Sequence, residues 1–175
     1  RFDPGFEAFM LDELIPFVEV RVAANGERLL MGASLGGLLS ATLALKHPER
    51  FHGVIAQSGA FLFGPGDDLA VHDRGGEWVL HELRRRPVEE LAHLRWTLDC
   101  GTVEWLTPVN RRLVAALRRR ALPFYYAERN AGHNWANWRD GLPGLLRRAL
   151  AVDKPAPTAP TAPTTPGTQQ AAKNR

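Results

Sequence analysis

The sequence predicts an α/β fold in which helices cover both faces of a mostly parallel β-sheet. Three observations support this prediction. Short apolar runs typical of buried strands alternate with longer segments of helical periodicity. Proline and glycine residues separate several of these segments from one another. A Gly-x-Ser-x-Gly sequence at residues 32–36 joins one apolar run directly to an apolar helix.

The first expected element is a helix over residues 6–22. Its apolar residues share one helical face and are Phe6, Phe9, Met10, Leu14, Phe17 and Val18. Pro16 lacks a backbone donor, so we expect the helix to kink or restart there. The Asn25-Gly26 pair predicts a turn, and residues 28–31 predict a short buried strand that leads into the Gly-x-Ser-x-Gly sequence.

A helix is expected over residues 35–47. It is apolar on nearly all sides, which is typical of a buried helix at the centre of a fold. Pro48 ends this helix. Residues 51–57 predict the second strand, and residues 60–75 predict a long loop rich in glycine and aspartate.

The remaining elements continue the alternation of helices and strands. A helix over residues 77–86 precedes a third strand over residues 94–99. Thr107 and Pro108 predict the N-cap and the first residue of the next helix. A fourth strand over residues 124–127 follows, and the apolar spacing of residues 142–150 predicts an amphipathic helix that completes the domain.

Composition divides the chain into a globular domain over residues 1–150 and a tail over residues 151–175. The tail consists mainly of proline, threonine and alanine, so we expect it to be disordered. In the whole chain, 45% of residues are hydrophobic and 23% are charged, as in a soluble globular protein. No apolar run approaches the ~18 residues that a membrane span requires.

The distribution of charge bears on whether the chain binds nucleic acid. Most of the formal net charge of +3 lies in the tail, so the nearly neutral domain gives no support to nucleic-acid binding. Two arginine clusters, residues 84–86 and 118–120, are expected at helix ends, where their positive charge interacts favourably with the negative end of the helix dipole.

Cys100 is the single cysteine of the chain, and we expect it to be a small buried residue. Because the sequence starts at Arg1, an export signal cannot be assessed, and a cytoplasmic location is favoured.

Polar residues suited to nucleophilic catalysis follow three of the predicted strands. Ser34 follows the first strand, Asp99 and Glu104 lie at or after the third, and His133 follows the fourth. Sites in parallel sheets lie at the carboxyl ends of strands. A serine hydroxyl becomes a nucleophile when an imidazole accepts its proton and a carboxylate holds the imidazole. This chain order of serine, acid and histidine is that of α/β-hydrolases.

The residues leave some alternatives open. The acid is Glu104 or Asp99, and His72, in the loop of residues 60–75, is the alternative base to His133. Trp135 and Trp138 either line a substrate cleft or pack the last helix.

Together these motifs resemble the esterase D and enterochelin esterase-like branch of the α/β-hydrolases. The resemblance covers roughly residues 1–150 and is carried by residues 9–16, 32–37, 48–51, 57–59, 100–104, 132–135 and 138–139. It implies that Ser34 is the nucleophile and His133 the base. The family's acid lies two residues after a Cys-Gly-Thr-type turn, which corresponds to Glu104, although Asp is commoner there. The family also usually has Gly-Gly-His where this chain has Ala-Gly-His.

The resemblance further implies hydrolysis of small-molecule carboxylic esters with no metal or cofactor. Relatives act on siderophore triesters, feruloylated sugars and thioesters, and some transfer acyl groups instead. The same site would therefore also suit an acyltransferase, and a catalytically inactive binding module is a third hypothesis. The identity of the ester and the oligomeric state stay open.

One departure from the family pattern concerns the oxyanion hole. The family has several strands before its Gly-x-Ser-x-Gly sequence, and a loop after an early strand supplies one donor. Only a helix and one strand precede the Gly-x-Ser-x-Gly sequence of this chain, so we expect the C-terminal part of an α/β-hydrolase fold without its N-terminal strands. The backbone N–H of Leu35 remains as a donor. Since loss of one donor lowers the rate ~10²–10³-fold, we expect this segment alone to be inactive or unstable and the intact protein to be an esterase.

Overall fold

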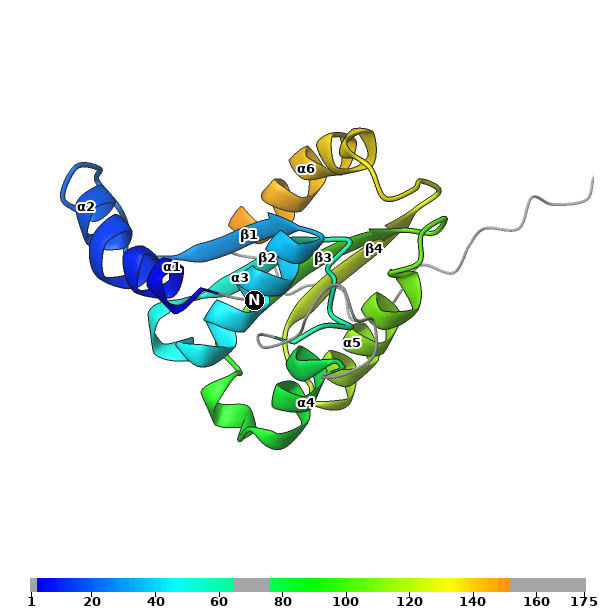
Figure 1. Ribbon diagram of the computed structural model, residues 1–175, viewed down its shortest axis with the longest axis horizontal. Coiled ribbons are helices and arrows are strands. Elements are labelled where there is room, and N and C mark those ends of the chain that lie inside the picture. The colour runs from blue at the N-terminus through cyan, green and yellow to red at the C-terminus, as the bar shows by residue number, and fades with distance from the viewer. Residues whose placement is uncertain (1–2, 65–75, 152–175) are drawn as a thin grey trace, which may run out of the picture.

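Four parallel strands form the sheet that the sequence predicts (Figure 1). In the computed structural model, which describes residues 3–64 and 76–151, they are β1 (Leu29–Ala33), β2 (Gly53–Gln57), β3 (Arg95–Gly101) and β4 (Phe124–Arg129). Their order in the sheet is that of the chain, and all three neighbouring pairs are parallel. All four carboxyl ends therefore lie at one edge of the sheet, as the predicted fold class requires.

Helices cover both faces of this sheet (Figure 1). On one face lie α3 (Leu35–Lys46), α4 (Trp78–Arg85) and α5 (Thr107–Arg119), and on the other lies α6 (Trp135–Leu150). Short 3₁₀ helices, η2 (Pro48–Arg50) and η3 (Val88–Glu90), precede β2 and β3. Three segments come before β1, namely α1 (Pro4–Ala8), the π-helical η1 (Phe9–Leu14) and α2 (Ile15–Glu19). The predicted arrangement of helices on both faces is thus confirmed.

The core follows from the alternation of side chains along the strands. On β2, Val54 and Ala56 pack into the large cluster beneath α3, α4 and α5, whereas Ile55 packs with Leu145 and Ala149 of α6. Because both faces are covered, every residue of β2 is buried. The continuous apolar run that predicted this strand is therefore explained by burial on both faces.

The segment before β1 differs from the single helix expected over residues 6–22. The π-helical stretch ends one residue before α2 begins at Ile15, and Pro16 lies in the first turn of α2. The expected restart at the proline is confirmed, since Pro16 has no N–H to continue the preceding ladder. The expected apolar face is not a core face, because Leu11 is buried whereas Phe6, Phe9, Phe17 and Val18 are exposed.

Two helix starts differ from the prediction. Thr107 is not the N-cap of α5 but its first residue; its hydroxyl lies 2.6 Å from the carbonyl oxygen of Gly101 and 2.8 Å from that of Glu104. The hydroxyl therefore donates to the preceding turn instead of accepting from the helix. The last helix begins at Trp135, seven residues before the predicted start. The side chain of Asn134 caps it, and it tolerates Pro143 in its interior.

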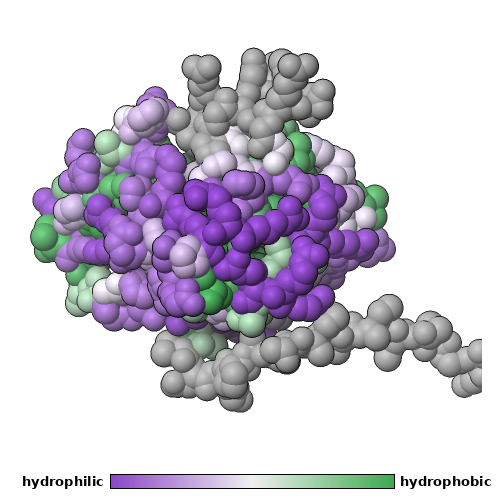
Figure 2. All heavy atoms as spheres, turned by 90° about the horizontal axis from the view of Figure 1, so that it is seen from below, coloured by the Kyte–Doolittle hydropathy of each residue, from purple (hydrophilic) through white to green (hydrophobic). Residues whose placement is uncertain are grey.

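The arginine clusters lie in the last turns of α4 and α5, as predicted. Arg120 donates from its guanidinium to the carbonyl oxygen of Arg84 at 2.6 Å and to that of Arg86 at 2.5 Å. It thereby satisfies carbonyl groups at the end of α4 that have no partner within the helix. Figure 2 views the molecule from below Figure 1, where α4 lies, and this surface is largely hydrophilic.

Some expectations concern residues that the structure does not describe. The disordered tail was expected over residues 151–175, and all but the first of these lie outside the described residues. The same holds for His72 and for residues 65–75 of the long loop. Among the helices in the described ranges, none combines the length and the apolar character that crossing a membrane would require.

A buried hydroxyl in α3 leads to a stability prediction. Thr42 is 1% exposed, and its Oγ1 has no hydrogen-bond partner among the described residues. Valine has nearly the same shape without the hydroxyl, so Thr42→Val is expected to raise the free energy of unfolding by about 1 kcal/mol. Urea denaturation measures the change. Ser40→Ala is the matched control, because the Ser40 hydroxyl donates to the Gly36 carbonyl and its loss should lower stability. A less stable Thr42→Val variant would contradict the prediction.

Candidate active site

Ser34 lies on the turn between β1 and α3 in a backbone conformation that residues other than glycine rarely adopt. Its φ is 55° and its ψ is −118°. The turn is held by the end of β2, because the Ser34 N–H donates to the Gln57 carbonyl at 2.9 Å. The Ser34 carbonyl in turn accepts from the Ala60 N–H at 3.0 Å. Strain of this kind persists only where surrounding contacts enforce it, and it is frequent at active sites.

The two glycines of Gly-x-Ser-x-Gly have different roles in this turn. A Cβ atom at Gly32 would lie 2.2 Å from the carbonyl carbon of Gly36, so a side chain cannot fit there. A Cβ atom at Gly36 would meet nothing within 4 Å. A side chain at Gly32 would therefore collide with neighbouring backbone, whereas one at Gly36 would not. What matters at Gly36 is that its backbone approaches Gly32.

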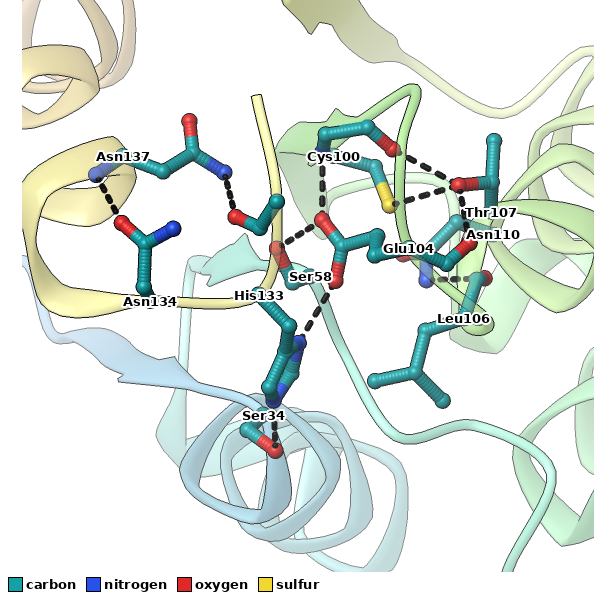
Figure 3. Close-up of polar contacts among 12 residues, drawn as sticks. Ser34, Ser58, Cys100, Glu104, Leu106, Thr107, Asn110, His133, Asn134 and Asn137 are labelled. Carbon is teal, nitrogen blue, oxygen red and sulfur yellow. Dashed lines mark hydrogen bonds and ion pairs between the residues drawn. The ribbon is translucent and has the colours of Figure 1, made fainter.

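The structure brings Ser34, His133 and Glu104 together in one hydrogen-bonded chain (Figure 3). Nε2 of His133 lies 3.0 Å from Oγ of Ser34, and its Nδ1 lies 2.5 Å from Oε2 of Glu104. The three side chains come from the turn after β1, the loop after β3 and the loop after β4. The Glu104 side chain is fully buried, whereas the His133 side chain is 25% exposed. The imidazole therefore bridges a buried carboxylate and a more accessible hydroxyl.

Glu104, and not Asp99, contacts the imidazole. Oδ2 of Asp99 accepts from Nη1 of Arg129 at 2.6 Å and from Nε2 of Gln57 at 3.3 Å. Burial raises the pKa of Asp99 above its usual range, although the Arg129 guanidinium acts in the opposite direction. Asp99 is thus occupied in a buried ion pair beneath the site.

The other described histidines have local partners away from Ser34. Nε2 of His47 lies 2.7 Å from a carboxylate oxygen of Glu7, and Nδ1 of His52 accepts from the Arg28 N–H. His93 contacts the Pro48 carbonyl, and His81 is largely exposed beside Glu82 on α4.

Hydrogen bonds of the buried Asn137 hold the loop that carries His133. Nδ2 of Asn137 donates to the Gly132 carbonyl at 3.1 Å, and the Asn134 side chain accepts from the Asn137 N–H at 3.0 Å. The Arg129 guanidinium donates to Oδ1 of Asn137 and also to Asp99. The Asp99 ion pair therefore links the loop that carries His133 to the centre of the sheet.

Aromatic rings surround the imidazole. The ring of Trp138 meets that of His133 edge-on, with centroids 5.0 Å apart, and Trp135 packs against Trp138 at the same distance. Trp135 is 81% exposed, whereas Trp138 is partly buried and donates from Nε1 to Oγ of Ser58 at 3.1 Å. The ring of Trp105 lies further away, with its centroid 6.4 Å from that of His133.

Sequence reasoning did not single out Trp105 or Ser58 as site residues. The sequence did carry signals for both: Ser58 directly follows the second predicted strand and belongs to residues 57–59, which carry the family resemblance, and Trp105 directly follows Glu104.

Comparison with known proteins assigns the chain to a family. The sequence profile of the family described as Putative esterase matches residues 3–149. The chain belongs to the Putative esterase family. Its curated relatives include the iron(III) enterobactin esterase of Escherichia coli strain K12, which is 31% identical over 142 residues. The match covers 77% of this chain and 33% of that relative, so the chain spans about a third of the relative's length.

Solved esterase structures resemble this one. An enterobactin esterase from Shigella flexneri, determined in the presence of enterobactin, is 30% identical, with a TM-score of 0.64 over 83% of this chain and 37% of its own. A ferulic acid esterase of 21% identity shares the fold, with a TM-score of 0.70 over 83% of this chain and 61% of its own. The resemblance to enterochelin esterase-like α/β-hydrolases is thus confirmed, and the four-stranded sheet is part of an α/β-hydrolase fold.

The electrostatics of this chain favour negative charge next to Ser34. Leu35 is the first residue of α3, so its N–H has no carbonyl partner within the helix and lies at the positive end of the helix dipole. Cys100 is buried beside Glu104, and burial together with the Glu104 carboxylate raises the pKa of the thiol to about 12, which keeps it protonated. Within the described ranges, no group of three or more His, Cys, Asp or Glu side chains is placed to hold a metal ion.

Proposed function

We propose that this protein is a serine esterase that hydrolyses small-molecule carboxylic esters, with Ser34 as nucleophile, His133 as base and Glu104 as acid. The observation that carries the proposal is the chain of contacts from Ser34 Oγ through the imidazole to the buried Glu104 carboxylate. A hydroxyl, an imidazole and a carboxylate in this order constitute the arrangement that activates a serine.

Each step of the reaction uses an atom of this arrangement. In the tautomer that carries its proton on Nδ1, His133 donates to Glu104 and its Nε2 accepts the Ser34 proton as Oγ attacks the ester carbonyl carbon. The Leu35 N–H donates to the oxyanion that forms. His133 then protonates the leaving alcohol, and the acyl group remains on Ser34. Water attacks this acyl-enzyme while His133 accepts its proton; the bond from the acyl group to Ser34 Oγ then breaks, His133 returns the proton to Oγ, and the carboxylic acid leaves.

The tryptophans beside the base suit substrate binding. Trp135 offers an exposed ring, and Trp138 supports both that ring and the imidazole. We propose that both contact the part of the ester that lies next to His133, because exposed aromatic rings supply apolar contact area in binding sites.

A fluorophosphonate probe tests the proposal. Such a probe phosphonylates a serine rapidly only where a base activates the hydroxyl and donors hold the developing charge. In the intact protein, meaning the protein at its natural length, we expect rapid labelling that mass spectrometry maps to Ser34. His133→Ala is the control and should abolish the labelling. A folded protein whose Ser34 stays unlabelled would refute the esterase proposal.

The choice of acid gives a second prediction. Glu104→Gln is expected to lower kcat about 10³- to 10⁴-fold, because an amide opposite Nδ1 no longer stabilises the imidazolium or holds its tautomer. The matched variant Asp99→Asn should lower kcat less than about 10-fold and mainly reduce the melting temperature, since Asp99 pairs with Arg129. Steady-state kinetics with an aryl ester compare the two. A larger loss in Asp99→Asn would reverse the assignment.

We further propose that residues 1–175 by themselves are a poor catalyst. The Leu35 N–H is the one oxyanion donor assigned among the described residues, and loss of one donor lowers rates ~10²–10³-fold. Initial rates of ester hydrolysis by this chain and by the protein at its natural length test this statement. Equal rates for a natural form that is longer than this chain would contradict it.

A further inference from the structure

A second strained serine lies beside the proposed nucleophile. Ser58 directly follows β2 and has a φ of 48°, close to the 55° of Ser34 after β1. The Ser58 N–H donates to the Asp99 carbonyl at 2.8 Å, which continues the pairing of β2 with β3 past the strand end. Ser58 is fully buried. If this residue only had to reverse the chain direction, glycine would do so without strain. A buried serine with a positive φ therefore indicates that its side chain has a role.

The Ser58 hydroxyl lies between Glu104 and Trp138 (Figure 3 shows its contact with Glu104). It lies 2.7 Å from Oε1 of Glu104, and Nε1 of Trp138 donates to it at 3.1 Å. An indole N–H can only donate, and a carboxylate can only accept. The direction of both hydrogen bonds is therefore fixed: the Ser58 oxygen accepts from Trp138, and its hydrogen points to the carboxylate.

These contacts determine which way the Glu104 carboxylate faces. A glutamate side chain has one more rotatable bond than an aspartate, so it needs more contacts to stay in one orientation. Oε1 accepts from the Ser58 hydroxyl and from the Gly101 N–H, which leaves Oε2 to face Nδ1 of His133. Trp138 meanwhile packs edge-on against the same imidazole. Ser58 and Trp138 thus link the acid to the ring that packs against the base.

We propose that Ser58, oriented by Trp138, is a positioning residue that holds the Glu104 carboxylate against His133. This inference rests on the proposed esterase function. The Ser58 hydroxyl donates to Glu104, the carboxylate that contacts the imidazole, so it acts on the base through Glu104. Removing its hydroxyl should therefore slow the chemical step and leave ground-state substrate binding almost unchanged.

The test measures Ser58→Ala in two backgrounds of the intact protein. In the wild-type background, kcat for an aryl ester and the rate of Ser34 labelling by a fluorophosphonate should both fall about 10- to 100-fold, with KM nearly constant, since one hydrogen bond to a charged group is lost. In the Glu104→Ala background, adding Ser58→Ala should change kcat less than about 3-fold, because the group that it positions is gone.

Controls separate a positioning role from a structural one. Thr42→Val removes a buried hydroxyl in α3 that has no hydrogen-bond partner among the described residues, and it should keep the wild-type labelling rate. Trp138→Phe keeps a ring against His133 but removes the indole donor; its loss of kcat should be smaller than that of Ser58→Ala, and the combined loss of the two variants should be less than additive. This variant also tests the inference if Ser58→Ala does not fold.

The outcomes distinguish the two proposals. If the folded wild-type protein is not labelled at Ser34, the esterase proposal fails. If the wild-type protein is labelled normally but Ser58→Ala keeps the wild-type rate, only the inference about Ser58 is overturned. An equal loss of kcat in both backgrounds would also overturn it, because Ser58 would then act independently of Glu104.

Discussion

Replacing His133 with alanine is expected to lower kcat for ester hydrolysis about 10⁶-fold. Nε2 of His133 lies 3.0 Å from Ser34 Oγ, and no other imidazole among the described residues contacts this hydroxyl. Without the base, the serine proton has no acceptor when Oγ attacks, and the leaving alcohol has no donor. In hydrolases that use such a triad, loss of the base alone therefore costs nearly as much as loss of all three residues.

Kinetics of the single and double variants check this prediction. Ser34→Ala should reduce kcat as much as His133→Ala, and the double variant should be no slower than either, because the two residues act as a unit. His81→Ala is the matched control: this histidine is exposed on α4, and its loss should leave kcat unchanged. A His133→Ala variant that keeps a tenth or more of the wild-type kcat would show that another group acts as base.

The sequence predicted the strands and the central helix because their apolar patterns are strong and local. β2 is buried on both faces, and α3 is buried along most of its length, so each is an apolar run with clear breaks at its ends. The start of α6 was missed because the helix contains Gly141, Pro143 and Gly144, which disfavour helical structure. Packing against the sheet and the Asn134 cap outweigh these propensities.

The choice between Glu104 and Asp99 could not be made from the residues alone, because it depends on where β3 ends. The strand was predicted to end at residue 99, but it continues to Gly101 and pairs Asp99 with Ala127. Asp99 therefore lies inside the strand, where its side chain reaches Arg129 under the site. Glu104 lies on the loop that follows β3, where its carboxylate contacts the His133 imidazole. A difference of two residues in strand length thus decides which carboxylate meets the imidazole.

The contacts that complete the site join residues far apart in the chain. Ser58 meets Glu104 across 46 positions, and Trp138 meets Ser58 across 80. Local periodicity carries no information about such pairs. Their proximity follows from the register of the sheet: Ala33 pairs with Gln57, so Ser34 and Ser58 are the equivalent first residues beyond two neighbouring strands. Topology thus places the proposed nucleophile and the proposed positioning residue side by side.

The same edge of the sheet gives a prediction of large effect on stability. Gly32→Ala is expected to lower the free energy of unfolding by about 3 kcal/mol or more, a large part of the ~5–15 kcal/mol typical of a whole domain. The new Cβ would lie 2.2 Å from the Gly36 carbonyl carbon and 2.3 Å from its oxygen. Both atoms belong to backbone in the first turn of α3, so relief requires the helix to move away from β1.

Gly36→Ala provides the matched control for this prediction, because its Cβ would meet nothing within 4 Å. Alanine also suits a helix better than glycine, so stability should stay within about 1 kcal/mol of the wild-type value. Denaturant unfolding followed by circular dichroism compares the two variants, and fluorophosphonate labelling reports whether Ser34 keeps its conformation. Equal stability of the two variants would mean that the Gly32–Gly36 contact does not hold α3 against β1. Steric exclusion of a side chain would then no longer explain why glycine occupies the first position of Gly-x-Ser-x-Gly.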